Sequence, residues 1–183
     1  MLDEHYARNG MIARWRPVHL GQAAVLQALC NHADQALIGI GSSNRYNARN
    51  PFTLKETEDM LRLTLTGRDN FTLMPVPDLD DGPLWRLFVL DLFGELDLFV
   101  TDNPYVTNLL RADYRLIRPV ELLPSEEHVR INGNMVRAMM ARGEGWQTWV
   151  EERCVHYIQK NKLDERFRNE FGLETLAMAT IVE

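Results

Sequence analysis

Residues 14–22, with the sequence RWRPVHLGQ, gather the side chains of this chain that are best suited to binding an anion. Two arginines and His19 lie on a turn between an expected strand and a following helix, where Gly21 lets the backbone approach a ligand closely. The free N–H groups at a helix N-terminus add partial positive charge, which favours phosphate. The sequence holds no GxxxxGKS or GxxxxGKT motif, so this turn is not a P-loop. The residues alone leave two alternatives: phosphate binding, or a solvated turn with a structural histidine.

The composition indicates a globular chain that buries one ordinary core. The chain has 183 residues, of which 45% are hydrophobic and 25% charged, and we expect them to form a single domain over residues 1–183. Its net charge of −6 argues against a partner such as nucleic acid or anionic lipid. Net charge does not exclude a local group of arginines, so the anion site remains compatible with it.

The sequence predicts neither a membrane span nor an export signal. Residues 1–9 lack the apolar region of a signal peptide, and the most apolar stretch, residues 84–100, contains four charged residues. A spanning helix needs about 20 largely uncharged residues. Cys30 and Cys154 have neither metal-ligand spacing nor a disulfide pattern, which suits a reducing, cytoplasmic location.

Strand and helix patterns alternate along the chain. The expected strands are Met11–Trp15, Ala36–Ile40, Phe71–Val76, Leu96–Thr101 and Leu116–Val120. The expected helices are Gln22–His32, one after the Thr53–Glu56 capping box, Leu84–Phe93, one from Pro104, Met135–Arg142, and a longer helical tail over Trp146–Asn161. This alternation predicts an α/β fold with a parallel sheet and helices on both faces. Such sheets bind ligands in loops at the carboxyl ends of their strands, as in the loop containing Ser42.

Several motifs, in order, resemble the nucleotidylyltransferase superfamily and, within it, the archaeal-type nicotinamide-nucleotide adenylyltransferases. Residues 14–22 resemble the setting GRxxPxHxGH of the HxGH signature, and residues 38–42 with 49–53 resemble IGIGSA followed by RDPFT or RNPFT. Residues 75–78 with Leu84-Trp85 resemble PVPD and LW. The remaining matches are residues 101–104, which resemble SGNP, and residues 131–137, which resemble the SGTExR segment. The similarity covers roughly residues 11–142 and implies a Rossmann-like fold.

The resemblance implies adenylyl transfer from Mg·ATP to nicotinamide mononucleotide, giving NAD and pyrophosphate, in a homo-oligomer. The attacking phosphate oxygen is already anionic near neutral pH because its second pKa is about 6. The reaction therefore needs no general base; it needs in-line placement of two anions and positive charge where pyrophosphate leaves. Arginines, helix N-terminal amides and Mg²⁺ supply that charge.

The family roles carry over to individual positions of this chain. Those expected at the reacting phosphates are Arg14, His19, Gln22, Arg49 and Arg137. Those expected around the nucleotide are Gly21, Ser42, Asn103, Asn132 and Asn134, and those expected around the nicotinamide are Asp78 and Trp85. The acidic run at residues 78–81 is expected to be a solvated loop, so no side chain is assigned as a metal ligand.

Two motifs depart from the family pattern, which keeps other functions open. Gln22 stands in place of the second histidine of HxGH, and Asn132 and Asn134 stand in place of the Ser and Thr of SGTExR. An amide still donates hydrogen bonds but carries no charge. One alternative is therefore a non-catalytic, nucleotide-binding paralogue, and another is a nucleotidylyltransferase for a different phosphorylated substrate. For single residues, Trp85 also fits an apolar helical stripe in the core, and Asn132 also fits a plain helix N-cap.

Overall fold

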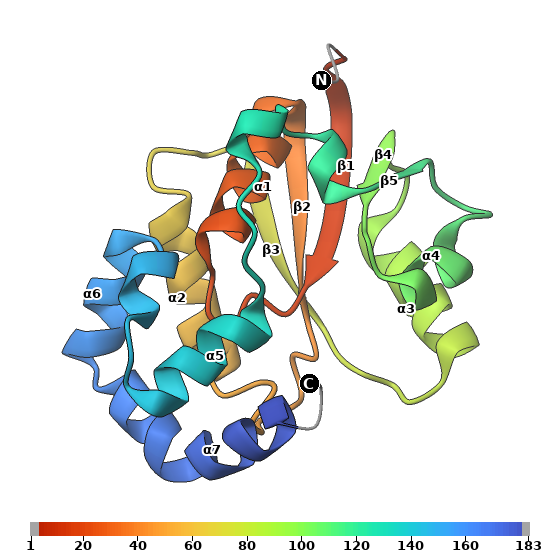
Figure 1. The fold of residues 1–183 in the computed structure, drawn as a ribbon. Coiled ribbons are helices and arrows are strands. Elements are labelled where there is room, and N and C mark those ends of the chain that lie inside the picture. Colours follow the sequence, from red (N-terminus) through yellow and green to blue (C-terminus); the bar gives the residue numbers. More distant parts are fainter. Residues whose placement is uncertain (1–3, 181–183) are drawn as a thin grey trace. The chain divides into compact units, whose positions relative to one another are not determined.

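The computed structural model describes residues 4–180, which divide into two compact units (Figure 1). Unit 1 combines the residues up to 14 with 24–44 and 67–128. Unit 2 combines 15–23, 45–66 and the residues from 129 onward. The boundary falls in the first turn of α1 (Leu20–Asn31), so this helix contributes to both units.

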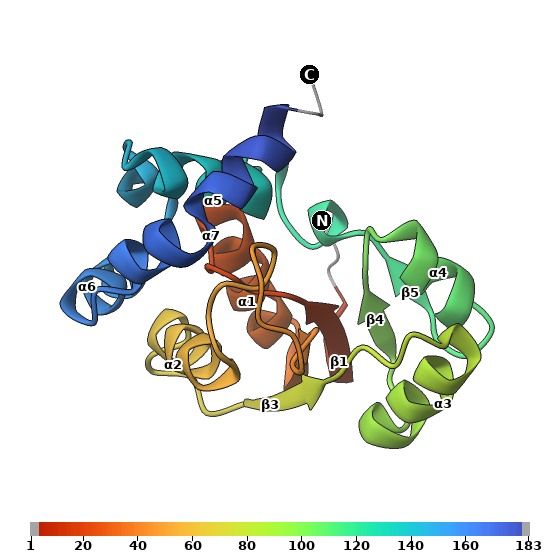
Figure 2. The same ribbon diagram turned by 90° about the horizontal axis from the view of Figure 1, so that it is seen from below.

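Unit 1 contains a five-stranded sheet in which all neighbouring strands run parallel. Its strands are β1 (Tyr6–Ala13), β2 (Ala33–Gly41), β3 (Phe71–Val76), β4 (Leu98–Val100) and β5 (Leu116–Ile117). The spatial order is β3-β2-β1-β4-β5, and Figure 2 shows the sheet from below, with β3 at one edge and β5 toward the other. The order reverses beside β1, and ligands of such sheets bind outside the carboxyl ends of the strands at this switch point.

Helices cover both faces of this sheet. Successive side chains of a strand point to opposite faces, so neighbouring residues pack against different helices. Gly39 of β2 faces α3 (Gly82–Phe93): a Cβ there would come within 3.0 Å of the Phe93 ring, so glycine permits the close packing. Asn9 of β1 points to the opposite face, where its Nδ2 donates to the Leu29 carbonyl of α1 at 2.8 Å. The predicted α/β fold with helices on both faces is confirmed.

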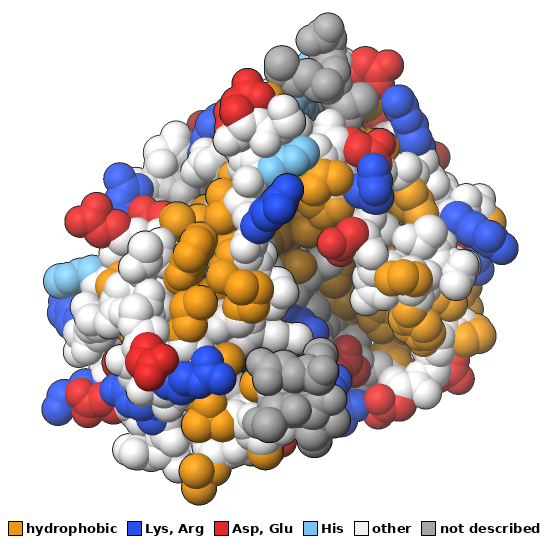
Figure 3. All heavy atoms as spheres, in the orientation of Figure 1, with side chains coloured by type: hydrophobic (Ala, Val, Ile, Leu, Met, Phe, Trp, Pro, Cys, Tyr) orange, Lys and Arg blue, Asp and Glu red, His pale blue; other side chains and the backbone are white. Residues whose placement is uncertain are grey.

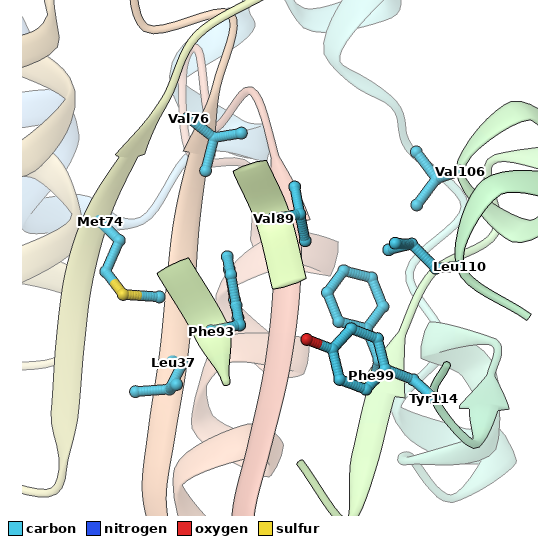
Figure 4. Close-up of a cluster of buried hydrophobic side chains, with 9 residues drawn as sticks. All are labelled: Leu37, Met74, Val76, Val89, Phe93, Phe99, Val106, Leu110 and Tyr114. Atoms are coloured by element: carbon cyan, nitrogen blue, oxygen red, sulfur yellow. The ribbon is translucent and has the colours of Figure 1, made fainter. Parts of the chain in front are cut away.

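Aromatic and aliphatic side chains fill the space between the sheet, α3 and α4 (Pro104–Leu110). The Phe93 and Phe99 rings meet edge to face at 5.8 Å, and Phe99 stacks on Tyr114 at 5.6 Å. Figure 4 draws the nine buried members of this cluster: Leu37, Met74, Val76, Val89, Phe93, Phe99, Val106, Leu110 and Tyr114. Two short 3-10 helices, η1 (Pro119–Glu121) and η2 (Ser125–Glu127), follow the sheet.

Unit 2 is helical. Its elements are α2 (Leu54–Thr64), α5 (Gly133–Arg142), η3 (Trp146–Trp149), α6 (Glu152–Lys160) and α7 (Leu163–Thr180). Helix α5 packs against α7, and α6 packs against both α2 and α7 (Figures 1 and 2). Cys154 is buried where α6 meets α2, with its Sγ 3.3 Å from the Met60 carbonyl. Burial raises the pKa of this thiol to about 12, so it is protonated at neutral pH.

Polar side chains define where the helices begin. Thr53 and Glu56 form the predicted capping box at the start of α2. The Asp81, Asn103 and Asn132 side chains accept backbone N–H groups at the starts of α3, α4 and α5 respectively. Each satisfies a donor that has no partner within its helix.

The expected bounds of the first and fifth strands are wrong. The first strand begins at Tyr6 and ends at Ala13, because buried Asn9 finds a helix carbonyl and Trp15 adopts a left-handed φ of 57°. The fifth strand stops at Ile117, since Pro119 cannot donate to a sheet ladder and begins η1 instead.

The expected helix over Trp146–Asn161 is also wrong as a single element. The chain is extended at Val150, which forms an isolated antiparallel bridge with His19, and α6 then begins behind an N-cap at Glu151. Periodicity cannot show a two-residue break that a partner distant in sequence stabilises.

Among residues 4–180, no helix has both the length and the apolar character needed to cross a membrane. On the face drawn in Figure 3, basic and acidic side chains are interspersed.

Candidate functional site

In unit 1, four of the expected site residues lie at or just beyond the carboxyl ends of strands. Arg14 follows β1 and is exposed, Ser42 follows β2, Asp78 follows β3 by two residues, and Asn103 follows β4 by three. Parallel strands end at the same edge of the sheet, so the fold brings these positions to one edge.

Hydrogen bonds join the loops after β2 and β3. The Ser42 Oγ donates to Asp78 Oδ1 at 3.1 Å. Asn44 is bonded to Asp78 in both directions: its Nδ2 donates to the Asp78 carbonyl at 3.0 Å, and its Oδ1 accepts the Asp78 N–H at 2.9 Å. Ser42 itself has φ of 52°, a left-handed conformation that is uncommon outside glycine. The Asp78 carboxylate is therefore held in one position, with its Oδ1 engaged by Ser42.

Trp85 lies in the first turn of α3, whose start is fixed by the Asp81 cap. It is partly buried and packs against the cluster of Figure 4. The structure thus gives Trp85 a packing role, and its partly exposed surface leaves the stacking role a prediction.

Asn103 uses its side chain to cap α4. Its Oδ1 accepts the Tyr105 N–H at 2.9 Å, and its own N–H donates to Thr101 Oγ1 at 3.2 Å. The amide nitrogen of the side chain keeps two donor hydrogens by type. Asn103 is therefore oriented by the helix it begins.

In unit 2, His19 occupies the N-cap position of α1, since its carbonyl accepts the Ala23 N–H at 2.9 Å. The Gln22 N–H donates to His19 Nδ1 at 3.3 Å, and the His19 N–H donates to Gln22 Oε1 at 3.4 Å. This reciprocal pair has the pattern of a capping box with an imidazole in place of the usual hydroxyl. Because Nδ1 accepts, the proton of the neutral ring is assigned to Nε2.

Burial determines the charge state of His19. Burial, followed by the positive charge of Arg137, lowers the pKa of His19 to about 4. At neutral pH the imidazole is uncharged and offers Nε2–H as a hydrogen-bond donor. A phosphate placed beside it would favour the protonated form and raise this pKa.

Arg137 is only 5% exposed, although it carries a permanent charge. Its Nη1 donates to the Arg16 carbonyl at 2.9 Å, and its Nη2 donates to Asn134 Oδ1. A Cβ at Gly133 would lie 2.9 Å from Nη1, so a larger residue there would displace the guanidinium. The start of α5 is therefore shaped around this arginine.

The N-termini of α1 and α5 lie close together within unit 2. A Cβ at Gly21 would lie 3.4 Å from both His19 Nδ1 and the Val129 carbonyl. Asn132 caps α5, with its Oδ1 accepting the N–H groups of Asn134 and Met135 at 3.0 Å each. Two helix N-termini and a buried guanidinium therefore concentrate positive charge here, as a phosphate site requires.

Arg49 is presented at a tight turn. Asn47 and Asn50 close it with two backbone hydrogen bonds, at 2.8 and 3.2 Å, and the Asn47 Oδ1 accepts the Arg49 N–H at 3.1 Å. Arg49 is exposed. The turn thus fixes the backbone while leaving the guanidinium at the surface.

Two residues with structural roles at these positions were missed from the sequence. Arg16 is 1% exposed, and its Nε donates to Thr57 Oγ1 at 3.1 Å, so it joins the His19 segment to α2. Asn44 holds Asp78, as described above. The signal for Arg16 was its place within the anion-binding turn; for Asn44 it was a position two residues after Ser42, in a loop at the ligand-binding edge.

The described residues contain no group of three or more His, Cys, Asp or Glu side chains arranged to hold a metal ion. The groups that this part of the chain offers toward an anion are arginines, an imidazole N–H and helix N-terminal amides.

The fold and these positions define a nucleotidylyltransferase-type α/β protein, and a solved structure has the same fold. It is a bifunctional nicotinamide-mononucleotide adenylyltransferase and ADP-ribose pyrophosphatase from Francisella tularensis, complexed with AMP and a manganese ion. The TM-score is 0.67 at 17% identity, over 97% of this chain and 54% of the other, so this chain spans about half the length of that protein.

The chain belongs to the nicotinamide-nucleotide adenylyltransferase family of nucleotidyltransferases. It is 30% identical over 156 residues to the enzyme of Thermoplasma volcanium, covering 84% of this chain and 86% of that protein. It is 28% identical over 167 residues to the enzyme of Pyrococcus abyssi, covering 88% of each. No family model matches the chain. The family resemblance predicted from the sequence motifs is confirmed.

Proposed function

We propose that this protein transfers the adenylyl group of Mg·ATP to nicotinamide mononucleotide. The observation that carries the proposal is the arrangement of His19, Arg137 and the N-termini of α1 and α5 in a chain of this family. An uncharged, buried imidazole N–H beside a buried arginine is suited to a polyphosphate, which supplies the compensating negative charge.

In the reaction, an oxygen of the mononucleotide phosphate attacks the α-phosphorus of ATP. A new P–O bond forms there while the bond from the α-phosphorus to the bridging oxygen breaks, and pyrophosphate leaves with the electron pair. No proton must be removed from a nucleophile whose second pKa is about 6. The protein's contribution is alignment and stabilisation of the charge on the leaving group.

Magnesium enters this proposal as part of the substrate. Mg²⁺ keeps several waters and is often held through substrate phosphates.

We assign roles to the residues in two groups. Arg14, His19, Arg49 and Arg137 bind the phosphates, and Gln22 orients His19 through the reciprocal hydrogen bonds at the start of α1. The nucleotide is further contacted by Gly21, Ser42, Asn103, Asn132 and Asn134, whereas Asp78 and Trp85 contact the nicotinamide.

The test is direct. The protein is incubated with Mg·ATP and nicotinamide mononucleotide, and NAD and pyrophosphate are measured together. Equal amounts of both products support the proposal. Parallel reactions with nicotinate mononucleotide and with other phosphorylated acceptors show whether the acceptor is different.

A second candidate is a nucleotide-binding protein without transferase activity. It is favoured by Gln22, whose side chain is neutral and whose Oε1 already accepts the His19 N–H. ATP binding by calorimetry, with no product formed from any acceptor tested, would establish this second function instead.

A further inference from the structure

The C-terminal helix α7 is joined by its side chains to the loop that presents Arg49. Arg166 of α7 donates to both carboxylate oxygens of Glu56, from Nη1 at 2.6 Å and from Nη2 at 2.7 Å. The same Nη2 also donates to the Pro51 carbonyl at 3.2 Å. Such a two-point contact orients the groups as well as attracting them.

Glu56 connects this contact to the start of α2. Its Oε2 accepts the Thr53 N–H at 2.9 Å, which completes the capping box. Burial opposes ionisation of Glu56, but the hydrogen bonds from Arg166 and Thr53 outweigh it and lower the pKa. Arg166 therefore holds the chain on the C-terminal side of the Arg49 turn.

Tyr46 makes the corresponding contact on the N-terminal side of the turn. Its ring lies 5.8 Å from Arg166 Cζ and meets the Phe171 ring edge to face at 5.1 Å. Its hydroxyl donates to Glu170. Three residues of α7, namely Arg166, Glu170 and Phe171, thus contact Tyr46.

We propose that Arg166 is a positioning residue that holds the loop over residues 46–53, so that Arg49 is presented in a fixed orientation to the phosphates of the nucleotide. The proposal rests on the proposed function for the role of Arg49. It assigns a function to α7, which lies beyond the region of the motif resemblance. An exposed arginine on an unrestrained loop would lose more conformational entropy on binding phosphate.

The first experiment is hydrogen exchange of the backbone amides of residues 46–53, which needs no activity. Arg166→Met should speed exchange there by about tenfold or more. The matched control is Arg168→Met, because Arg168 lies on the same helix and pairs with Asp164 at 3.2 Å, within α7 itself. Unchanged exchange in Arg166→Met, or equal acceleration in both variants, overturns the proposal.

The second experiment is a double-mutant cycle with Arg49, using the dissociation constant of Mg·ATP and, in parallel, kcat and KM. Arg166→Met should weaken ATP binding by about tenfold in the natural chain and by less than about twofold in Arg49→Ala. A merely structural role would weaken binding equally in both backgrounds, and that additive result refutes positioning through Arg49.

A third variant guards against simple misfolding. Arg166→Lys keeps the charge but loses the two-point geometry. Its exchange rate at residues 46–53 and its affinity for Mg·ATP should therefore lie between the values for the natural chain and for Arg166→Met. If the natural protein binds ATP but forms no NAD, the proposed transferase function fails while the binding cycle still decides the positioning role. If it binds no ATP, positioning for nucleotide is overturned whatever the exchange shows.

Discussion

Replacing His19 with glutamine should remove a large part of the acid sensitivity of folding. In the folded protein the pKa of His19 is lowered from 6.5 to about 4 by burial and by Arg137. Between these values the unfolded chain binds a proton that the folded chain does not, so stability is lost as pH falls through this window. The gap, at about 1.36 kcal/mol per pH unit, amounts to about 3 kcal/mol.

Urea unfolding at several values between about pH 7 and about pH 4.5 measures this effect. The difference in free energy of unfolding between the natural protein and His19→Gln should narrow by about 2 kcal/mol over that range. Carboxylates such as Glu56 contribute equally to both proteins and cancel. Parallel pH profiles for the natural protein and His19→Gln would refute the assignment of a buried, neutral histidine.

Three further predictions concern ligand binding. Arg137→Met should weaken Mg·ATP binding by about one to two decades, because a charged hydrogen bond contributes about 1.5–3 kcal/mol. Arg142→Met, at an exposed position of the same helix, is the control in calorimetry, and equal ATP affinities of Arg137→Met and the natural protein would contradict the phosphate role. Trp85→Ala should raise KM for nicotinamide mononucleotide more than KM for ATP and should also lower Tm, whereas Trp85→Phe should preserve KM and Tm. A change in Tm without a change in KM would show that Trp85 only packs against the core. Gln22→His should increase kcat, and more so as pH falls toward about 6.5, since an imidazolium adds a charged donor. A ratio of kcat between Gln22→His and the natural protein that does not change with pH would contradict this.

Local sequence patterns were sufficient for the elements whose causes are local. The Thr53–Glu56 capping box and the Asn132 cap depend on residues three or fewer positions apart, and both are confirmed. Local patterns failed where a distant partner decides. Val150 is extended because it pairs with His19, and no property of the residues around it indicates that break.

The candidate site shows the same division. Residue types alone left residues 14–22 as either an anion-binding turn or a solvated one, and the family resemblance added a phosphate-binding arginine at the start of α5. The structure adds that the Arg137 guanidinium donates to Arg16, 121 positions away, and that its charge lies near enough to His19 to lower the imidazole pKa. The roles of the site residues toward ATP and nicotinamide mononucleotide stay predictions.

Side-chain type and short-range spacing were enough to predict the alternation of strands and helices and to mark residues 14–22 as a candidate phosphate site. The family was predicted from the resemblance of several ordered motifs, and the roles of single residues toward phosphate stay predictions. Packing of distant segments was needed to establish the charge state of His19, the burial of Arg16 and Arg137, and the contact of Arg166 with Glu56 across 110 positions. These properties depend on desolvation and on Coulomb interactions over a few ångströms, and such distances exist only once segments remote in sequence have packed together.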